Sequence, residues 1–380
     1  ALQAERVAIL PEGPMDGLSI GMRVELIFAP SLAPANSWIG RIIDPFGQPL
    51  DGRPLLAGGE ERGFRPAPPP AASRNRLGAR LDTGLAVFDT LLPLVRGQRM
   101  GLFAGSGVGK STLLSALARG VSADVVVIGL IGERGRELRE FVEEVLGPEG
   151  MARSVVVAAT SDQSPLARRR CAWAAMTVAE HFRDQGKHVL FLADSITRFA
   201  EAHREIALAA GESPSYRGFP PSTSQMIMSL AERSGPGPVG SGDITAIFSV
   251  LVAGSDMEEP VADILRGVLD GHVVLDRAIA ERGRFPAVDV LRSVSRSLPQ
   301  AASTRENALI ARARSLLGTY AESELMIRAG LYGPGSDARL DEAVRIFPQL
   351  DTFFTRKSPD AKQSFSQLSE ALGPVSARPG

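Results

Sequence analysis

The sequence is poor in the residues that build disulfide frameworks and metal centres. Its single cysteine, Cys171, rules out a disulfide within the chain, and its four histidines show no metal-ligand spacing. Basic and acidic residues nearly cancel, at 42 against 43, which argues against bulk nucleic-acid binding because phosphate contacts demand clustered lysine and arginine. No run of 18 apolar residues and no signal peptide is present. These absences favour a globular protein of a reducing cytoplasm.

The 380 residues, 44% of them hydrophobic, suffice for about two or three domains. The chain begins with Ala1 rather than methionine, which predicts a fragment whose natural start lies upstream. Residues 1–56 predict a partial β-domain, because short strand patterns alternate there with turn signals. The expected strands are Glu5–Leu10, Ser19–Phe28 and Trp38–Ile43. A proline-rich stretch then marks a linker over residues 57–76.

Residues 77–300 alternate strand and helix patterns, which predicts an α/β core. Continuous apolar runs of this kind are typical of parallel strands covered on both faces by helices. The predicted strands are Met100–Ala104, Val125–Ile131, Ser154–Ala159, Val189–Leu192 and Ile244–Val252. The predicted helices are Glu137–Leu146, Pro165–Gln185, Thr197–Ala210 and Thr223–Arg233. Residues 301–380 show helical patterns alone, at Thr304–Leu317, Ala321–Ala329, Leu340–Phe347 and Asp360–Ala371, and predict a small helical domain.

The stretch GLFAGSGVGKST, residues 101–112, has the pattern of a phosphate-binding loop between a strand and a helix. Its glycines let successive N–H groups converge on phosphate oxygens, and the helix N-terminus adds partial positive charge. Lys110 would reach the β- and γ-phosphates, and the Ser111 hydroxyl would bind Mg²⁺. Ala104 stands where the strict pattern has glycine, but it is small enough to keep the turn. The alternative is a tight turn entering an ordinary helix. The predicted nucleotide-binding residues are Gly105, Ser106, Gly107, Val108, Gly109, Lys110, Ser111 and Thr112.

Two carboxylates follow predicted strands, and ligands of parallel sheets bind beyond the strands' carboxyl ends. Asp194 ends an apolar run, where a buried acid needs a cation; beside a phosphate loop that cation is Mg²⁺. The alternative for Asp194 is a helix cap. Glu133 would polarise the water that attacks the γ-phosphate, and Arg134 could neutralise phosphate charge. Both could equally belong to a solvated helix start with local ion pairs.

Three further sites carry open alternatives. Arg296 is a candidate arginine finger or a structural ion-pair partner. Phe285 is a candidate stacking platform for a base or a core aromatic residue. The triplet at residues 168–170 indicates a solvated arginine face, or a contact with a partner.

Taken together, the motifs resemble one known family. The phosphate loop is followed by GERGRE at 132–137, DSITRFA at 194–200, GFPPS at 218–222, DMEEPVAD at 256–263, LDGH at 269–272 and FPAVDV at 285–290. In this order they resemble the flagellar protein-export ATPases of the type III secretion ATPase family, relatives of the rotary F1 catalytic subunit. The likeness extends from residue 40 through the helical end. Residues 222–226, STSQM, depart from the family's usual apolar continuation.

The resemblance implies an N-terminal β-barrel, a RecA-like core and a helical C-terminal domain in a homo-hexameric ring. It implies ATP and Mg²⁺ as cofactors, with Lys110, Glu133, Arg134, Asp194 and Arg296 catalytic and with Ser111 and Asp194 at the metal. Arg296 matches the finger donated by an adjacent subunit, and Phe285 matches the aromatic residue that packs on adenine. The implied partners are the stalk, regulator and chaperone-cargo proteins of an export apparatus, at the cytoplasmic face of the inner membrane.

Three other functions stay open at this stage. A virulence injectisome ATPase would share the chemistry and differ in cargo. A rotary ATP synthase subunit would belong to a hetero-hexamer, whereas Glu133 and Arg296 on one chain suit a ring of identical subunits. An RNA translocase would need a basic, aromatic-bearing barrel, and residues 1–56 offer little of either.

Overall fold

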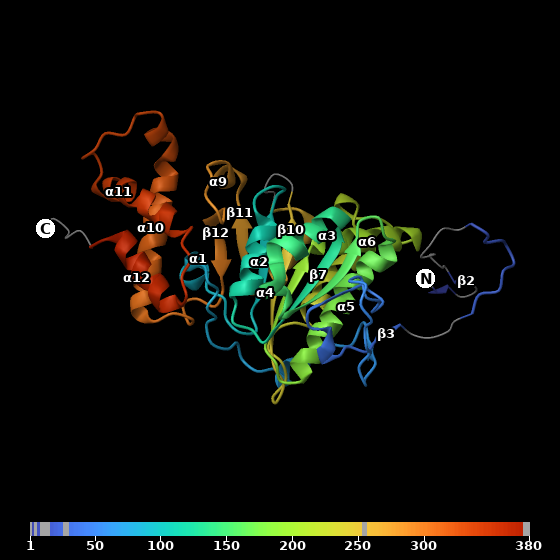
Figure 1. Ribbon diagram of the computed structural model, residues 1–380. Coiled ribbons are helices and arrows are strands. Elements are labelled where there is room, and N and C mark those ends of the chain that lie inside the picture. The colour runs from blue at the N-terminus through green and yellow to red at the C-terminus, as the bar shows by residue number, and fades with distance from the viewer. Residues whose placement is uncertain (1, 4–5, 8–15, 26–29, 253–256, 375–380) are drawn as a thin grey trace.

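The computed structural model describes residues 2–3, 6–7, 16–25, 30–252 and 257–374 (Figure 1). Its centre is an eight-stranded sheet in the order β12-β11-β6-β10-β9-β7-β8-β4, as counted within these residues. All neighbours run parallel except β11 and β12, which are antiparallel. The strands are β4 (Arg41–Ile43), β6 (Arg99–Ala104), β7 (Val125–Glu133), β8 (Ser154–Thr160), β9 (Val189–Asp194), β10 (Ile244–Leu251), β11 (Gly271–Leu275) and β12 (Val288–Ser295).

The predicted parallel sheet is confirmed. Side chains of one strand alternate between two hydrophobic cores: Met100 and Leu102 enter one core, and Phe103 enters the other. Both faces of β6 are therefore buried, which is why its sequence is continuously apolar rather than alternating. Sequence analysis did not predict β11 or β12; β11 is only five residues long, and polar residues interrupt the apolar pattern of β12.

Helices cover both faces of the sheet (Figure 1). One core includes α2 and the C-terminal helices, and the other includes α5, α6, α7 and α8. The core helices are α1 (Ala86–Asp89), α2 (Lys110–Gly120), α3 (Gly135–Glu140), α4 (Gly147–Met151), α5 (Pro165–Asp184), α6 (Ile196–Ala209), α7 (Ser222–Ala231), α8 (Pro260–Val268) and α9 (Arg277–Glu281). Shorter helical segments are η1 (Asn36–Trp38), η2 (Ala71–Ser73), the π-helix η3 (Phe141–Leu146) and η4 (Tyr216–Gly218).

The C-terminal region is helical, as predicted, and consists of α10 (Thr304–Arg328), α11 (Ala338–Phe353) and α12 (Ala361–Leu372) in the described residues. The two helices predicted over 304–317 and 321–329 form the single helix α10, which is a correction. Gly318 lies inside it, because one glycine costs a helix only about 1 kcal/mol and packing of the surrounding turns outweighs that cost. The region is anchored on the core: the Ala361 amide donates to Asp82 (3.0 Å) and the Ser364 hydroxyl to Asp89 (3.0 Å).

The N-terminal region differs from the prediction. Residues 19–25 form turns and irregular structure instead of the predicted strand, and 26–28 lie outside the described residues. The described strands are β1 (Leu2–Gln3), β2 (Arg6–Val7), β3 (Ser31–Leu32) and β5 (Arg62–Gly63), which form two-stranded pairs. β4 instead extends the central sheet beside β8, because its apolar residues pair there in parallel register. The described residues of 1–56 thus show no closed barrel, and the domain boundaries at 56, 76 and 300 stay predictions.

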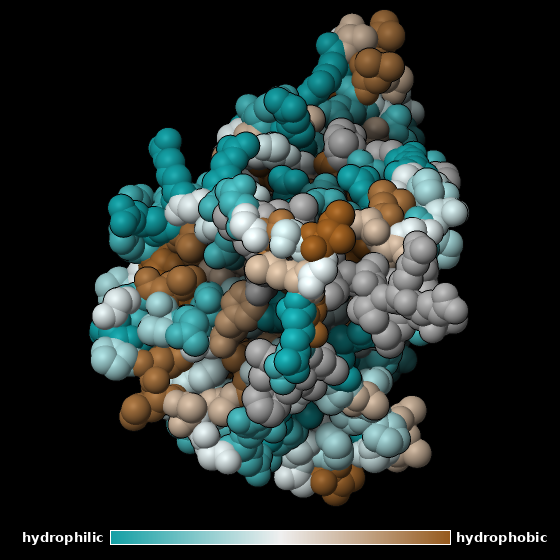
Figure 2. Space-filling model, turned by 90° about the vertical axis from the view of Figure 1, so that its right-hand side faces the viewer, coloured by the Kyte–Doolittle hydropathy of each residue, from teal (hydrophilic) through white to brown (hydrophobic). Residues whose placement is uncertain are grey.

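The N-terminal segment and the helical region lie at opposite ends of the core (Figure 1). On the face that carries the N-terminal segment, hydrophobic residues are scattered among hydrophilic ones (Figure 2). None of the helices in the described residues has the length and apolar character that crossing a membrane requires.

Candidate active site

The phosphate-binding loop lies between the end of β6 and the start of α2. Gly107 and Gly109 adopt positive φ angles of 76° and 84°, which residues with a side chain rarely adopt. A Cβ added to Gly109 would also lie 3.1 Å from the Phe285 ring. The glycines are therefore required by the turn itself, and the nucleotide-binding residues predicted over 105–112 form one continuous loop and helix start.

Lys110 and Glu133 line one cavity, and the buried Asp194 lies directly behind Lys110. The Lys110 ammonium forms an ion pair with Asp194, and its Nζ lies 3.7 Å from Glu133 Oε1. The cavity of about 820 Å³ is lined by the loop, by Glu133 and by the first turn of α6. The structure thus brings together three side chains that are 23 to 84 positions apart in sequence.

The topology of the sheet explains why these three side chains lie close together. β7 and β9 are neighbouring parallel strands, and Leu130 is paired with Asp194. Both strands therefore have their carboxyl ends on the same side of the sheet as β6. Asp194 is buried, and its Oδ1 accepts a 2.5 Å hydrogen bond from the Ser249 hydroxyl on β10. The helix cap that follows is supplied by Ser195, whose hydroxyl accepts from the Arg198 amide. The Asp194 side chain therefore does not cap α6 and instead contacts Lys110 and Ser249.

The pKa of the Glu133 carboxyl is raised to about 7, chiefly by burial and then by the nearby Asp194 charge, while Lys110 opposes the shift. A carboxylate with a pKa near neutrality can accept a proton from a water molecule efficiently. Desolvation and a neighbouring carboxylate, rather than a hydrogen bond, are the main causes of this property.

The oxygen donors beside Lys110 fit a magnesium ion. Mg²⁺ prefers hard oxygen ligands and usually takes one or two protein side chains together with phosphates and water. The Ser111 hydroxyl and the Asp194 carboxylate are such donors, and Asp194 is buried with a cation already beside it. Within the described residues no cluster of three or more histidine, cysteine, aspartate or glutamate side chains would form an all-protein metal site.

Three arginines also line the cavity: Arg134, Arg168 and Arg198. Arg134 is largely exposed and pairs with Glu137 at 3.3 Å, so it lies at the rim. Arg198, on the first turn of α6, pairs with Glu201 at 2.9 Å and was not predicted as a site residue. Its position four residues after Asp194 is the signal that could have revealed it.

A second cavity, of about 540 Å³, adjoins the loop; we call it the base cavity. It is lined by Gly107, Gly109, Phe285 and Pro286, and on the opposite side by Thr355 and Lys357 from the segment between α11 and α12. Phe285 is 49% exposed, so it is not a core residue and presents its ring to the cavity. Thr355 and Lys357 were missed, since no motif marks them in the sequence.

Arg296 is not brought to this site. Its amide donates to Asp270 O, and the Asp270 amide donates to Arg99 O at the start of β6. The phosphate loop follows the other end of β6, about 17 Å away for a six-residue strand. The Arg296 side chain is exposed, and its Nη2 donates to Arg266 O (3.1 Å).

The prediction of a solvated arginine face at residues 168–170 is wrong. Arg168 pairs with Glu205 at 3.0 Å, and Arg170 lies 4.3 Å from the Phe46 ring. Arg169 stacks on Trp173 at 5.0 Å. All three are half-buried, because helix α5 packs them against aromatic and acidic residues of the same chain.

The sheet and the cavity at its edge define the class of this protein: it is a nucleotide hydrolase with a RecA-like P-loop core. A model of the ATP synthase alpha/beta family, nucleotide-binding domain, matches residues 84–295, and a model of the T3SS EscN ATPase C-terminal domain matches residues 302–373. The chain belongs to the ATP synthase alpha/beta family and is an ATPase.

The relatives and solved structures that resemble this chain belong to the same group of ATPases. The flagellum-specific ATP synthase of Caulobacter vibrioides is 46% identical, over 97% of this chain and 85% of its own. That of Bacillus subtilis is 43% identical, over 97% and 83%. The assembled ATPase EscN of the enteropathogenic E. coli type III secretion system superposes with a TM-score of 0.84 at 38% identity, over 90% of this chain and 84% of EscN. The chain is thus a member of the group that contains the flagellum-specific ATP synthases and the type III secretion ATPases.

Proposed function

We propose that this chain hydrolyses Mg-ATP in a ring of identical subunits and so energises the export of flagellar proteins. One observation carries the chemical part of this proposal: Lys110 lies between Glu133 and Asp194 at the phosphate-binding loop, where Lys110 and Glu133 line a single cavity. β7 and β9 carry Glu133 and Asp194 at their carboxyl ends, and the loop after β6 leads to Lys110 at the start of α2, so all three meet where parallel α/β sheets bind ligands.

The residues would divide the work as follows. The loop amides and Lys110 bind the β- and γ-phosphates, replacing the contact that Lys110 makes with Asp194. Ser111 and Asp194 would hold Mg²⁺, which when bound supplies charge neutralisation at the phosphate oxygens. Glu133 orients the attacking water and accepts its proton, for which its raised pKa is suited. Arg134, at the rim, stabilises negative charge on the γ-phosphate.

The position of Arg296 supports a ring. The side chain is exposed at the end of the strands opposite to its own phosphate loop, so it can complete only the site of another subunit. The relative EscN is described as assembled, and also in complex with its central stalk EscO. By likeness we propose a homo-hexamer around a stalk protein, with regulator and chaperone-cargo proteins as further partners. We place it in the cytoplasm, peripheral to the inner membrane.

A second candidate is a virulence injectisome ATPase. The match of residues 302–373 to the EscN C-terminal domain model favours it, whereas the flagellum-specific relatives favour flagellar export. Both candidates share the chemistry and differ in cargo.

The test has a chemical and a cellular arm. Purified protein should release phosphate from Mg-ATP, and chelation of magnesium should stop the release. Expression in Bacillus subtilis lacking its flagellum-specific ATP synthase should restore swimming, while the Lys110→Ala variant should not. Hydrolysis without restored swimming would favour the injectisome candidate, and absence of hydrolysis would refute the proposed function.

A further inference from the structure

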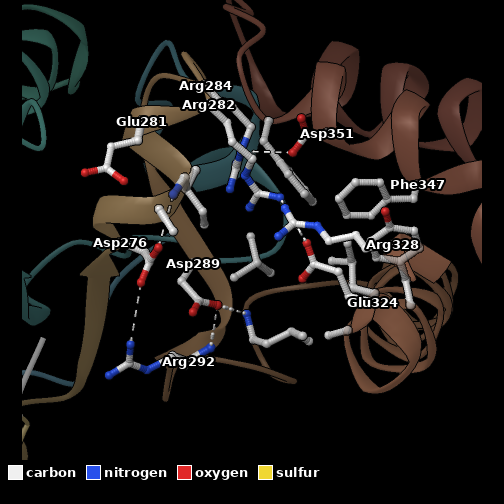
Figure 3. A pocket seen from close by; sticks show the side chains of 18 residues that line it. Asp276, Glu281, Arg282, Arg284, Asp289, Arg292, Glu324, Arg328, Phe347 and Asp351 are labelled. Atoms are coloured by element: carbon white, nitrogen blue, oxygen red, sulfur yellow. Dashed lines mark hydrogen bonds and ion pairs between the residues drawn. The ribbon is translucent and has the colours of Figure 1, made fainter. Parts of the chain in front are cut away.

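The loop that joins α9 to β12 separates two cavities. On one side is the base cavity, lined by Phe285, Pro286 and Thr355. On the other is a cavity of about 620 Å³, here called the interdomain cavity, between α9 and β12 of the core and helices α10 and α11 (Figure 3). Arg284 and Phe354 line the interdomain cavity. In each of two pairs of adjacent residues, 284–285 and 354–355, the first residue thus lines the interdomain cavity and the second lines the base cavity.

The charges of the interdomain cavity are balanced among themselves. Arg282 and Arg328 share Glu324, at 3.4 and 3.1 Å. Figure 3 shows Glu324 between these two arginines, with Arg284 beside them and directed toward Asp351. Five carboxylates and four guanidinium groups line the cavity, so no large surplus of one charge would select a ligand, and the function of the cavity wall must be sought in its contacts.

Arg284 differs from the other arginines of this wall because it is 8% exposed. Its Nε lies 3.0 Å from Asp351 Oδ1, and its Nη2 donates to Val288 O (2.8 Å). The guanidinium carbon is 5.2 Å from the centre of the Phe354 ring. Neither Nε nor Nη1 has a hydrogen-bond partner within the described residues, so the contact with Asp351 is an ion pair only. Burial lowers the pKa of Arg284, while Asp351 opposes this shift. A buried ion pair is often no more stabilising than apolar packing, so stability alone does not account for an arginine here.

These contacts connect the walls of the base cavity. The bond to Val288 O joins the two ends of the segment that carries Phe285, Pro286 and Ala287. The contacts with Asp351 and Phe354 reach the last turn of α11, directly before Thr355. One guanidinium therefore holds both the aromatic platform and the opposite wall.

We propose that Arg284 is a positioning residue, which holds the Phe285 ring at the spacing from α11 that a bound base requires. This inference rests on the proposed function, because it takes Phe285 as the surface on which the base stacks. The hydrogen bond and ion pair of Arg284 go to Val288 and Asp351, and none goes to the phosphate loop. Arg284 should therefore affect recognition of the base and leave recognition of the phosphates unchanged.

The experiment compares two ligands by titration calorimetry with Mg²⁺ present: ADP, which carries a base, and tripolyphosphate, which does not. The full chain carries Arg284→Met, Arg284→Lys or Asp351→Asn. In Arg284→Met the dissociation constant of ADP should rise about 3- to 10-fold, as expected for a lost aromatic contact. That of tripolyphosphate should stay within about twofold. Arg284→Lys, which can still pair with Asp351, should recover part of the ADP affinity.

The matched control is Arg277→Met, on α9 just before the loop that carries Arg284, where the arginine is 78% exposed and pairs with Glu281. This variant should change the dissociation constant of neither ligand. Hydrolysis at saturating ATP should fall less than about twofold in Arg284→Met while KM rises, because a binding interaction is lost. If Arg284→Met does not fold, Asp351→Asn decides, since Asp351 is 40% exposed and tolerates replacement.

Two results would overturn the inference: equal weakening of ADP and tripolyphosphate, which indicates general damage, or unchanged ADP binding in the folded Arg284→Met or Asp351→Asn variant. Wild-type protein that binds neither ligand would instead contradict the proposed function.

Discussion

The phosphate side of the site, formed by the loop cavity with Glu133 and Asp194, and the base side, formed by the base cavity, are built in different ways. On the phosphate side, each functional group directly follows a buried strand: the loop follows β6, Glu133 ends β7 and Asp194 ends β9. On the base side, Phe285 comes from a loop before the antiparallel strand β12, and Thr355 and Lys357 come from the helical region. One side is therefore held by the sheet, and the other depends on how two parts of the chain pack. The phosphate side should tolerate little change, while the base side should be adjustable.

The largest effect is expected at Lys110. Lys110→Ala should abolish hydrolysis and binding of tripolyphosphate, because the lysine supplies the only ammonium group lining the phosphate cavity among the described residues. Phosphate release and calorimetry would measure both losses. Lys362→Ala, on the exposed side of α12, is the matched control and should leave both unchanged. Normal turnover in Lys110→Ala would exclude this cavity as the active site.

Arg296 tests whether the phosphate side is completed by another subunit. Arg296→Ala should lower hydrolysis by about 10³-fold, because an inserted guanidinium stabilises the charge of the transferring phosphoryl group. Wild-type specific activity should rise with protein concentration, since the site requires two chains.

Mixing inactive Arg296→Ala with inactive Lys110→Ala should restore part of the activity, because some interfaces then combine an intact loop with an intact arginine. No recovery on mixing, together with concentration-independent wild-type activity, would make Arg296 a structural residue.

Glu133→Gln should separate binding from chemistry. The amide keeps the size of the side chain but cannot accept the proton of the attacking water, so hydrolysis should fall by about 10²- to 10⁴-fold. ADP affinity should change little, since the loop and Lys110 are intact. Loss of ADP binding as well would recast Glu133 as a residue that holds the cavity together.

The smallest effect is expected on the base side. Phe285→Ala should raise the dissociation constant of ADP by about 3- to 10-fold and leave tripolyphosphate unaffected, because only the stacking surface is removed. Phe285→Tyr keeps the ring and should behave as wild type. A strong effect of Phe285→Ala on tripolyphosphate would show that the ring supports the loop at Gly109, which it contacts, rather than the base.

The parallel strands could be predicted because burial on both faces makes a strand uniformly apolar, as in Val125–Ile131. The phosphate loop was also predictable from the local sequence, because the positive φ angles at Gly107 and Gly109 require glycine at these positions. The polar, partly exposed strand β12 and the undivided helix α10 were not predictable, because contacts with distant elements decide them. The strand predicted at Trp38–Ile43 is shorter, Arg41–Ile43, and this strand, β4, joined the sheet through pairing that its own three residues do not indicate.

The sequence alone determined the nature of the chemistry, because strand ends, turn glycines and a lysine at a helix start are local features. Only the tertiary structure decided which groups share a cavity, that Arg296 lies at the opposite edge of the sheet, and that Arg284 joins Phe285 to the helical region. The reason is physical. Turns and buried strands are specified by neighbouring residues, whereas meetings between distant segments follow from packing of the whole chain.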